Sequence, residues 1–264
     1  MTANGPVTRT ATSDATSITV RGKDLAGELM GHRSFTEMTY FLSVGRMPDP
    51  GETAVLDACL VSLMEHGWTP TSIIARLTAD SVPDDTQVAI AAGLLAVGPV
   101  FAGTMEGCAE ILLAGEEDSA DVDTWARLVA HEYLDAKRPL PGFGHRVHKP
   151  VDPRAVRLLE IAEEQGVDGP YLKRLKALGK AVDAVRGKPL PVNATGVIAA
   201  LFLEIGIPLR ASRGMATVSR AAGLLGHIVE EDRDPAARTI WQLTRQGVPY
   251  VEPDIEDSEE GTGR

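Results

Sequence analysis

A glycine-rich loop followed by a helix start occupies residues 141–154, Pro141-Gly142-Phe143-Gly144-His145-Arg146-Val147-His148-Lys149-Pro150-Val151-Asp152-Pro153-Arg154. Glycines on both sides of the phenylalanine let the backbone bend and approach another segment closely. Asp152 followed by Pro153 is typical of a helix N-cap, which places Arg154 in the first turn of a new helix. The imidazole of His145, with a guanidinium nine residues later, suits a bound carboxylate beside a polarised carbonyl.

The composition is typical of a soluble globular protein with an acidic balance. The 264 residues carry a formal net charge of −11 and a pI near 5.0, so the overall field repels phosphates and argues against nucleic-acid or anionic-membrane binding. The longest apolar run, 192–207, is too short and too often interrupted to span a bilayer. Cys59 and Cys108 lie in apolar segments without metal-ligand spacing, which predicts reduced core thiols in a cytoplasmic protein and no metal site.

Helical signals dominate the chain. Ser34 followed by Glu37 is a capping box that opens a helix, and apolar residues recur at helical spacing from Val55 to Met64. Strand signals are confined to 17–21 and 249–251. We therefore expect an all-α protein with about ten helices, over 35–44, 55–64, 86–97, 104–113, 123–136, 154–165, 169–185, 193–205, 216–231 and 235–245.

Two polar connections divide the predicted helices. Residues 115–120 are acidic, 186–191 read Arg-Gly-Lys-Pro-Leu-Pro, and the segment between them is richer in charge than its neighbours. We predict a flexible leader over 1–16, a large helical domain from 17–115 and 190–251, a small helical domain over 116–189, and an acidic disordered tail over 252–264.

The loop and helix start of residues 142–154 resemble the signature of the citrate synthase superfamily. In that family the glycine-rich loop runs beside coenzyme A, its histidine touches the substrate carbonyl oxygen, and the later arginine grips a carboxylate. The resemblance implies that His145 is catalytic and that Arg154 binds a substrate carboxylate. It also implies contacts to coenzyme A from Gly142, Phe143, Gly144, Arg146 and Lys149.

Further segments resemble the same family in the same order. Arg21-Gly22-Lys23-Asp24 is similar to an early Arg-Gly-x-Asp turn, and Glu65-His66-Gly67-Trp68 resembles a segment whose histidine helps to hold oxaloacetate. Ser219-Arg220-Ala221 resembles a helix whose arginine completes the dicarboxylate site. The resemblance covers roughly residues 18–250 and implies a two-lobed helical homodimer, truncated at the N-terminus relative to a full-length citrate synthase, with its site between the lobes.

Two positions depart from the family pattern. The segment Gly98-Pro99-Val100-Phe101-Ala102-Gly103 places Phe101 where the family has the histidine that steadies the enolate of acetyl-CoA. The segment 192–196 places Thr195 where the family has the aspartate that removes the acetyl proton. A phenyl ring donates no hydrogen bond, and a threonine hydroxyl is far too weakly basic to replace a carboxylate near neutral pH. Citrate synthase activity itself is therefore not expected.

Short chains of this size in which a phenylalanine turn replaces the histidine resemble citryl-CoA lyases and the C-terminal lyase module of ATP-citrate lyase, which cleave citryl-CoA to acetyl-CoA and oxaloacetate. The resemblance implies that His66 or His145 takes the hydroxyl proton, because a neutral imidazole is present near pH 7. Arg154 and Arg220 would each hold a carboxylate, and Asn193 would donate a hydrogen bond to the substrate. A coenzyme A thioester is then the substrate, and no tightly bound cofactor is expected.

Other interpretations remain open. The same site could act as an aldolase on a different 3-hydroxyacyl-CoA, or belong to a non-catalytic relative that binds coenzyme A or a dicarboxylate. Asn193 and Thr195 open an apolar helix, so N-capping explains both without chemistry. Arg220 could form a helix-surface ion pair, and His66 at a helix C-terminus could serve only the helix dipole.

Overall fold

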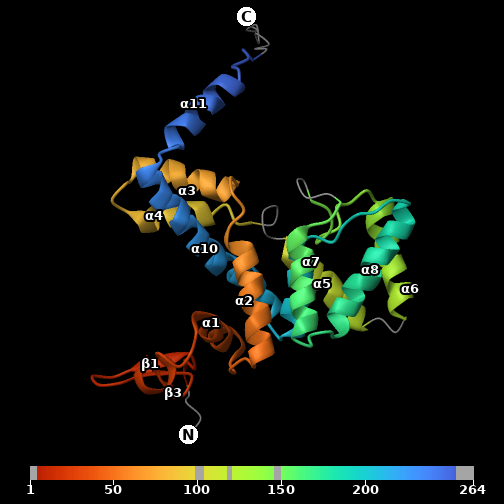
Figure 1. Ribbon diagram of the computed structural model, residues 1–264, viewed down its shortest axis with the longest axis horizontal. Helices are drawn as coiled ribbons and strands as arrows, with labels where there is room; N and C mark the ends of the chain where they lie inside the picture. The colour runs from red at the N-terminus through yellow and green to blue at the C-terminus, as the bar shows by residue number, and fades with distance from the viewer. Residues whose placement is uncertain (1–4, 99–103, 118–120, 146–149, 254–264) are drawn as a thin grey trace, which may run out of the picture.

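The protein is mostly helical in the computed structural model, which describes residues 5–98, 104–117, 121–145 and 150–253 (Figure 1). The all-α prediction is confirmed. The helices of the described ranges are η1 (Leu25–Leu29, a π-helical turn), α1 (Phe35–Val44), α2 (Pro50–Met64), α3 (Pro70–Ser81), α4 (Thr86–Leu94), α5 (Thr104–Glu117), α6 (Val122–Asp135), α7 (Pro153–Glu164), α8 (Pro170–Arg186), α9 (Ala194–Glu204), α10 (Leu209–Arg233) and α11 (Ala237–Gly247).

Local capping chemistry sets several helix starts at their predicted positions. The side chain of Ser34 accepts from the backbone N–H of Glu37 and the carboxylate of Glu37 accepts from that of Ser34, so α1 spans the predicted 35–44. α3 was not predicted, although Thr69 caps it and Pro70 stands at its first position. α4 ends at Leu94, earlier than the predicted residue 97.

A small antiparallel sheet precedes the helices. Its strands β1 (Ala11–Ser13), β2 (Ile18–Val20) and β3 (Lys23–Asp24) lie in the order β1-β2-β3. The predicted flexible leader over 1–16 is thus wrong at residues 11–13, because their backbone pairs with β2. The strand predicted at 249–251 is also wrong, since these residues form no ladder among the described part of the chain.

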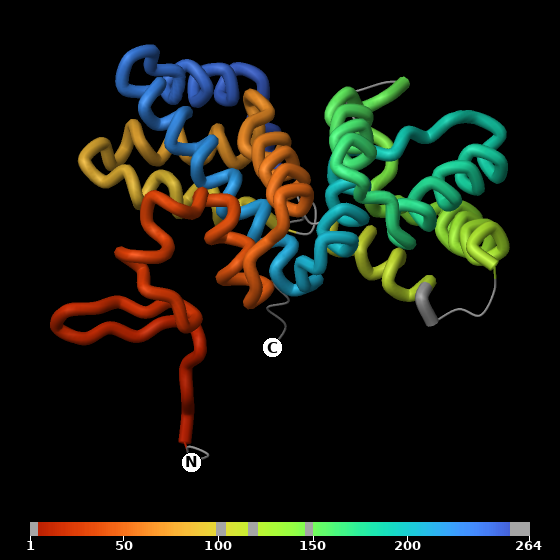
Figure 2. Tube along the Cα trace, turned by 60° about the horizontal axis from the view of Figure 1, so that its bottom comes forward, coloured from red at the N-terminus to blue at the C-terminus, as the bar shows by residue number. Residues whose placement is uncertain are grey.

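The helices gather into two groups that lie side by side (Figure 2). In one group α10 packs along α2, α3 and α4; in the other α8 packs on α6 and α9. The nearly fully buried α9 also contacts α5 and α7, and it touches α2 and α10 of the first group. Residues 17–115 and 190–251 as a large domain, and 116–189 as a small one, remain a prediction.

The prediction of free core thiols is confirmed for both cysteines. Cys59 and Cys108 are free and fully buried in the main core, and burial raises the pKa of Cys108 to about 12. Within the described ranges, no helix combines the length and the apolar character needed to cross a membrane.

Close packing of α10 on α2 brings the end of α2 to the middle of α10. A Cβ atom at Gly223 would lie 2.0 Å from the carbonyl oxygen of Met64. A glycine is therefore required there, and the approach places the residues after α2 against the face of α10 that carries Arg220.

Candidate active site

The glycine-rich loop rests on the start of α9. Gly142 and Gly144 have φ angles of 83° and 74°, which side-chain-bearing residues rarely adopt. A Cβ at Gly142 would lie 2.7 Å from Sγ of Cys108 and 2.8 Å from Cα of Gly196. The close backbone approach predicted for this loop is thus an approach to α5 and α9. Phe143 forms a β-bridge with Val192, which fixes the loop beside the segment that leads into α9.

Asn193 caps α9 and ties it to the loop. Its Oδ1 accepts from the backbone N–H of Gly196 at 3.1 Å and from the hydroxyl of Thr195 at 2.7 Å, while its Nδ2 donates to the carbonyl of Gly144 at 2.8 Å. Oγ1 of Thr104, at the start of α5, lies 2.8 Å from Oγ1 of Thr195. Because the Thr195 proton goes to Asn193, Thr104 must be the donor in that pair. The N-cap interpretation is confirmed for Asn193, whereas Thr195 lies inside α9 and donates to the cap residue.

Asp152 and Arg154 form a buried ion pair at the start of α7. The fully buried Asp152 carboxylate accepts from Nε and Nη2 of Arg154 at 3.1 and 2.9 Å. It also accepts from the backbone N–H of Arg154 at 3.1 Å and from that of Ala194 at 3.0 Å, so one side chain joins the starts of α7 and α9. Burial raises the pKa of Asp152, but the hydrogen bonds from Arg154 and Ala194 and the Arg154 charge prevail and lower it to about 2.

His145 lies between Arg154 and His66. Nε2 of His145 is 3.4 Å from Nη2 of Arg154, and an arginine N–H can only donate, so in this contact Nε2 is an unprotonated acceptor. The rings of His145 and His66 are 5.6 Å apart between centres and meet edge-on at 65°. Two imidazoles and a guanidinium thus converge from the loop, the turn after α2 and the start of α7.

Arg220 approaches the same place from α10. Its side chain is 15% exposed, its Nη1 has no hydrogen-bond partner among the described residues, and Oε2 of Glu65 is 3.8 Å away. Burial lowers the pKa of Arg220, the Glu65 carboxylate raises it, and the charge of Arg154 lowers it further. Arg220 thus forms an ion pair, as the helix-surface interpretation expected, but the surface location is wrong, because this cation is largely buried and lies within the field of Arg154.

The structure brings together most of the residues singled out in the sequence. His66, His145, Arg154 and Arg220 surround one region, and Asn193 supports the loop beside it. Arg146, Lys149 and Phe101 lie outside the described residues. Sequence reasoning missed the ion-pair partners Asp152 and Glu65, although Asp152 was recognised as a cap. Of the described residues, no group of three His, Cys, Asp or Glu side chains is placed to hold a metal ion.

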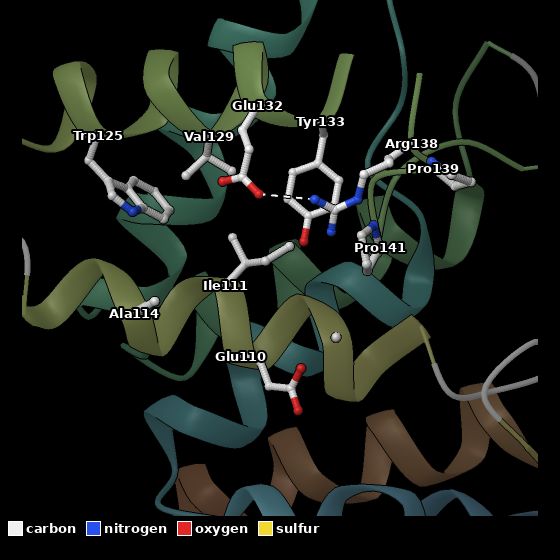
Figure 3. A pocket seen from close by; sticks show the side chains of 11 residues that line it. Glu110, Ile111, Ala114, Trp125, Val129, Glu132, Tyr133, Arg138, Pro139 and Pro141 are labelled. Carbon is white, nitrogen blue, oxygen red and sulfur yellow. Dashed lines mark hydrogen bonds and ion pairs between the residues drawn. The ribbon is translucent and has the colours of Figure 1, made fainter. Parts of the chain in front are cut away.

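A pocket of about 440 Å³ lies between α5, α6 and the residues just before the loop (Figure 3). The guanidinium of Arg138 lies 4.4 Å from the ring centre of Tyr133 and bonds the carboxylate of Glu132 at 3.1 Å. Pro139 and Pro141 line the pocket next to these side chains, so it opens directly beside the start of the glycine-rich loop.

A sequence match over most of the chain shows the family of this protein. Residues 32–243 match the family described as citrate synthase, C-terminal domain. The chain belongs to the citrate synthase family. A citrate synthase of Synechocystis sp. is 31% identical over 72% of this chain and 48% of its own length. A putative citrate synthase 2 of Mycobacterium tuberculosis is 31% identical over 78% of this chain and 53% of its own length. This citrate synthase family member thus spans about half the length of such curated relatives.

Solved structures also match over nearly the whole chain. Citryl-CoA lyase from Hydrogenobacter thermophilus superposes with a TM-score of 0.84 and 30% identity, over 94% of both chains. ATP citrate lyase from Methanothrix soehngenii, in complex with citrate and coenzyme A, has a TM-score of 0.81 over 96% of this chain and 42% of its own. At 18% identity, that second match concerns the fold alone.

Proposed function

We propose that this chain is a citryl-CoA lyase, which cleaves citryl-CoA to acetyl-CoA and oxaloacetate. The observation that carries the proposal is the match to a citryl-CoA lyase over 94% of both chains. The curated relatives named citrate synthase match only about half of their own length.

The cleavage needs a base, two anion sites and an electron sink. A base removes the proton of the tertiary hydroxyl, and the bond between the hydroxyl-bearing carbon and the acetyl methylene breaks. The oxygen becomes the carbonyl of oxaloacetate, and the bonding electron pair passes to the thioester as an enolate. Protonation of the enolate carbon then gives acetyl-CoA, and cations that hold the carboxylates fix the substrate throughout.

His145 suits the base because its Nε2 is the acceptor in its contact with Arg154. Arg154 is anchored by Asp152 through Nε and Nη2, which leaves Nη1 free of hydrogen bonds within the described part of the chain. Arg220 likewise carries a buried N–H without an acceptor there. Each guanidinium can therefore take one carboxylate of the substrate, and His66 can donate to it from the facing turn.

Coenzyme A would run along the glycine-rich loop. Gly142, Phe143 and Gly144 supply backbone next to it, and Arg146 and Lys149 supply the phosphate contacts. The pocket beside Pro139 and Pro141, with Arg138 stacked on Tyr133, offers space for its adenine end. In this proposal the protein is a cytoplasmic homodimer without a tightly bound cofactor.

The test mixes purified protein with citryl-CoA and follows oxaloacetate by its coupled reduction. We expect oxaloacetate and acetyl-CoA in equal amounts, with the rate lost in Arg154→Ala. No oxaloacetate above background, from folded protein, would refute the substrate assignment.

A second candidate is an aldolase on another 3-hydroxyacyl-CoA. The observation in its favour is that Thr195 stands where the family has an aspartate. Its hydroxyl is hydrogen-bonded to both Thr104 and Asn193, so it cannot serve as a replacement base. Screening hydroxyacyl-CoA substrates for released CoA esters separates the two. Binding of acetyl-CoA with no turnover on any of them would favour a non-catalytic relative.

A further inference from the structure

Glu65 occupies the centre of a contact network that the proposed chemistry does not use. Its Oε1 accepts from the backbone N–H groups of His66 and Gly67 at 2.8 and 2.6 Å, and it lies 3.0 Å from Nε2 of His227. Its Oε2 faces Arg220 at 3.8 Å, which is too far for a hydrogen bond. One carboxylate thus contacts both the turn that carries His66 and the cation on α10.

The position of Glu65 is fixed from behind by a buried arginine. Arg76 of α3 is 2% exposed and donates from Nε to Nδ1 of His227 at 3.1 Å. Because an arginine N–H cannot accept, Nδ1 of His227 must be unprotonated, and the ring proton lies on Nε2, where it points at Glu65. Arg76 is held in turn by the buried Glu231 at 2.8 Å. The network therefore runs from Glu231 through Arg76 and His227 to Glu65.

We propose that Glu65 is a positioning residue of the dicarboxylate site, an inference that rests on the proposed role of Arg220 in binding a carboxylate. Its Oε1 is engaged by the His66 turn and by His227, which holds Oε2 at 3.8 Å from Arg220, beyond hydrogen-bond distance. It therefore compensates the charge of Arg220 without occupying the N–H groups that a ligand needs. The negative charge of Glu65 offsets the cost of burying Arg220, and the guanidinium stays in place for a carboxylate of oxaloacetate.

The negative charge of Glu65 also has an opposite effect, because it repels an incoming anion. Glu65 is 45% exposed, so water screens that repulsion, whereas Arg220 is 15% exposed and would be left as an uncompensated buried cation. Such a cation moves toward solvent and away from the ligand position. We therefore expect positioning to outweigh repulsion. Removing the Glu65 charge would weaken oxaloacetate binding if positioning dominates, and would strengthen it if repulsion dominates.

The test measures the dissociation constant for oxaloacetate by calorimetry on full-length protein, with thermal unfolding as the check of folding. Glu65→Gln keeps an acceptor for the His66 turn but removes the charge, and we expect roughly tenfold weaker binding with kcat on citryl-CoA within about threefold. Glu65→Ala also frees the turn, so it should lower kcat as well as affinity. Unchanged or tighter oxaloacetate binding by Glu65→Gln would overturn the proposal.

A second pair of variants tests the network without altering Glu65. His227→Phe removes the donor to Glu65 and should weaken oxaloacetate binding. His227→Gln can still accept from Arg76 and donate to Glu65, so its oxaloacetate affinity should be close to that of wild type. Equal affinities of these two variants would count against the proposal. Glu164→Gln, an equivalent change in an exposed ion pair, is the control and should bind like wild type. Equal oxaloacetate affinity in wild type and Arg220→Ala would show that Arg220 binds no carboxylate, and the proposed function would then fail. If Arg220→Ala binds weakly but the Glu65 and His227 variants bind like wild type, only this inference fails.

Discussion

The buried pair of Asp152 and Arg154 makes a quantitative prediction for the variant Asp152→Asn. Lowering of the Asp152 pKa from 3.8 to about 2 corresponds to about 2.5 kcal/mol of stability at neutral pH. Replacing the carboxylate also leaves the Arg154 cation without its partner, so we expect a loss of about 3 kcal/mol at pH 7. The amide that replaces the carboxylate keeps only one acceptor oxygen, so it cannot accept from both Arg154 and the N–H of Ala194 as the two carboxylate oxygens do, which couples the loss to the start of α9.

The pH dependence has a definite sign. Because the folded-state pKa is lowered, the stabilisation is complete above the unfolded-state value near 3.8 and is lost as the pH falls through about 2. At pH 3 about 1.3 kcal/mol of the ionisation contribution remains, so the stability difference between wild type and Asp152→Asn should shrink by about 1 kcal/mol between pH 7 and pH 3.

Urea unfolding of both proteins at a series of pH values measures this difference, and titrations elsewhere cancel in the comparison. Asp121→Asn, which alters an exposed cap without a buried pair, should cost less at pH 7. A difference between wild type and Asp152→Asn that is small, or that stays constant from pH 7 to pH 3, would refute the ion-pair reasoning.

Four further predictions concern single positions. Arg154→Ala should weaken oxaloacetate binding about 100-fold in calorimetry, since a bidentate charged contact is lost; unchanged affinity would count against the whole site. Gly223→Ala should lower the urea-derived stability by about 1–3 kcal/mol, because its methyl group meets the Met64 carbonyl. Thr195→Val should cost about 1 kcal/mol by the same measurement yet leave kcat within about threefold, and a larger fall in kcat would give Thr195 a chemical role. Cys108 should resist alkylation at pH 8 until urea unfolds the protein, because its pKa of about 12 and its burial suppress the thiolate; mass spectrometry of the native protein checks this.

The features that local chemistry sets could be predicted from the sequence. Ser34 with Glu37, Asp152 with Pro153, and Asn193 each satisfy backbone groups within three residues, so their caps appear where the sequence places them. The convergence of His66, His145, Arg154 and Arg220 was expected only from a family resemblance, since nothing local brings four distant segments together.

The features that distant contacts set could not be predicted. Arg76 looks like a surface residue in sequence, and its burial depends on Glu231, 155 positions later. The contact of Glu65 with His227 spans 162 positions and depends on the glycine-permitted approach of α2 to α10. The strand β1 likewise depends on pairing with β2, because residues 11–13 carry no pattern of their own.

The direction of the reaction tests the central claim most directly. One preparation of the folded protein is given citryl-CoA in one vessel, and acetyl-CoA with oxaloacetate in another, with oxaloacetate and citrate followed in both. The account predicts release of oxaloacetate in the first vessel and no net citrate in the second. Citrate formation in the second vessel, or no oxaloacetate in the first, would contradict it.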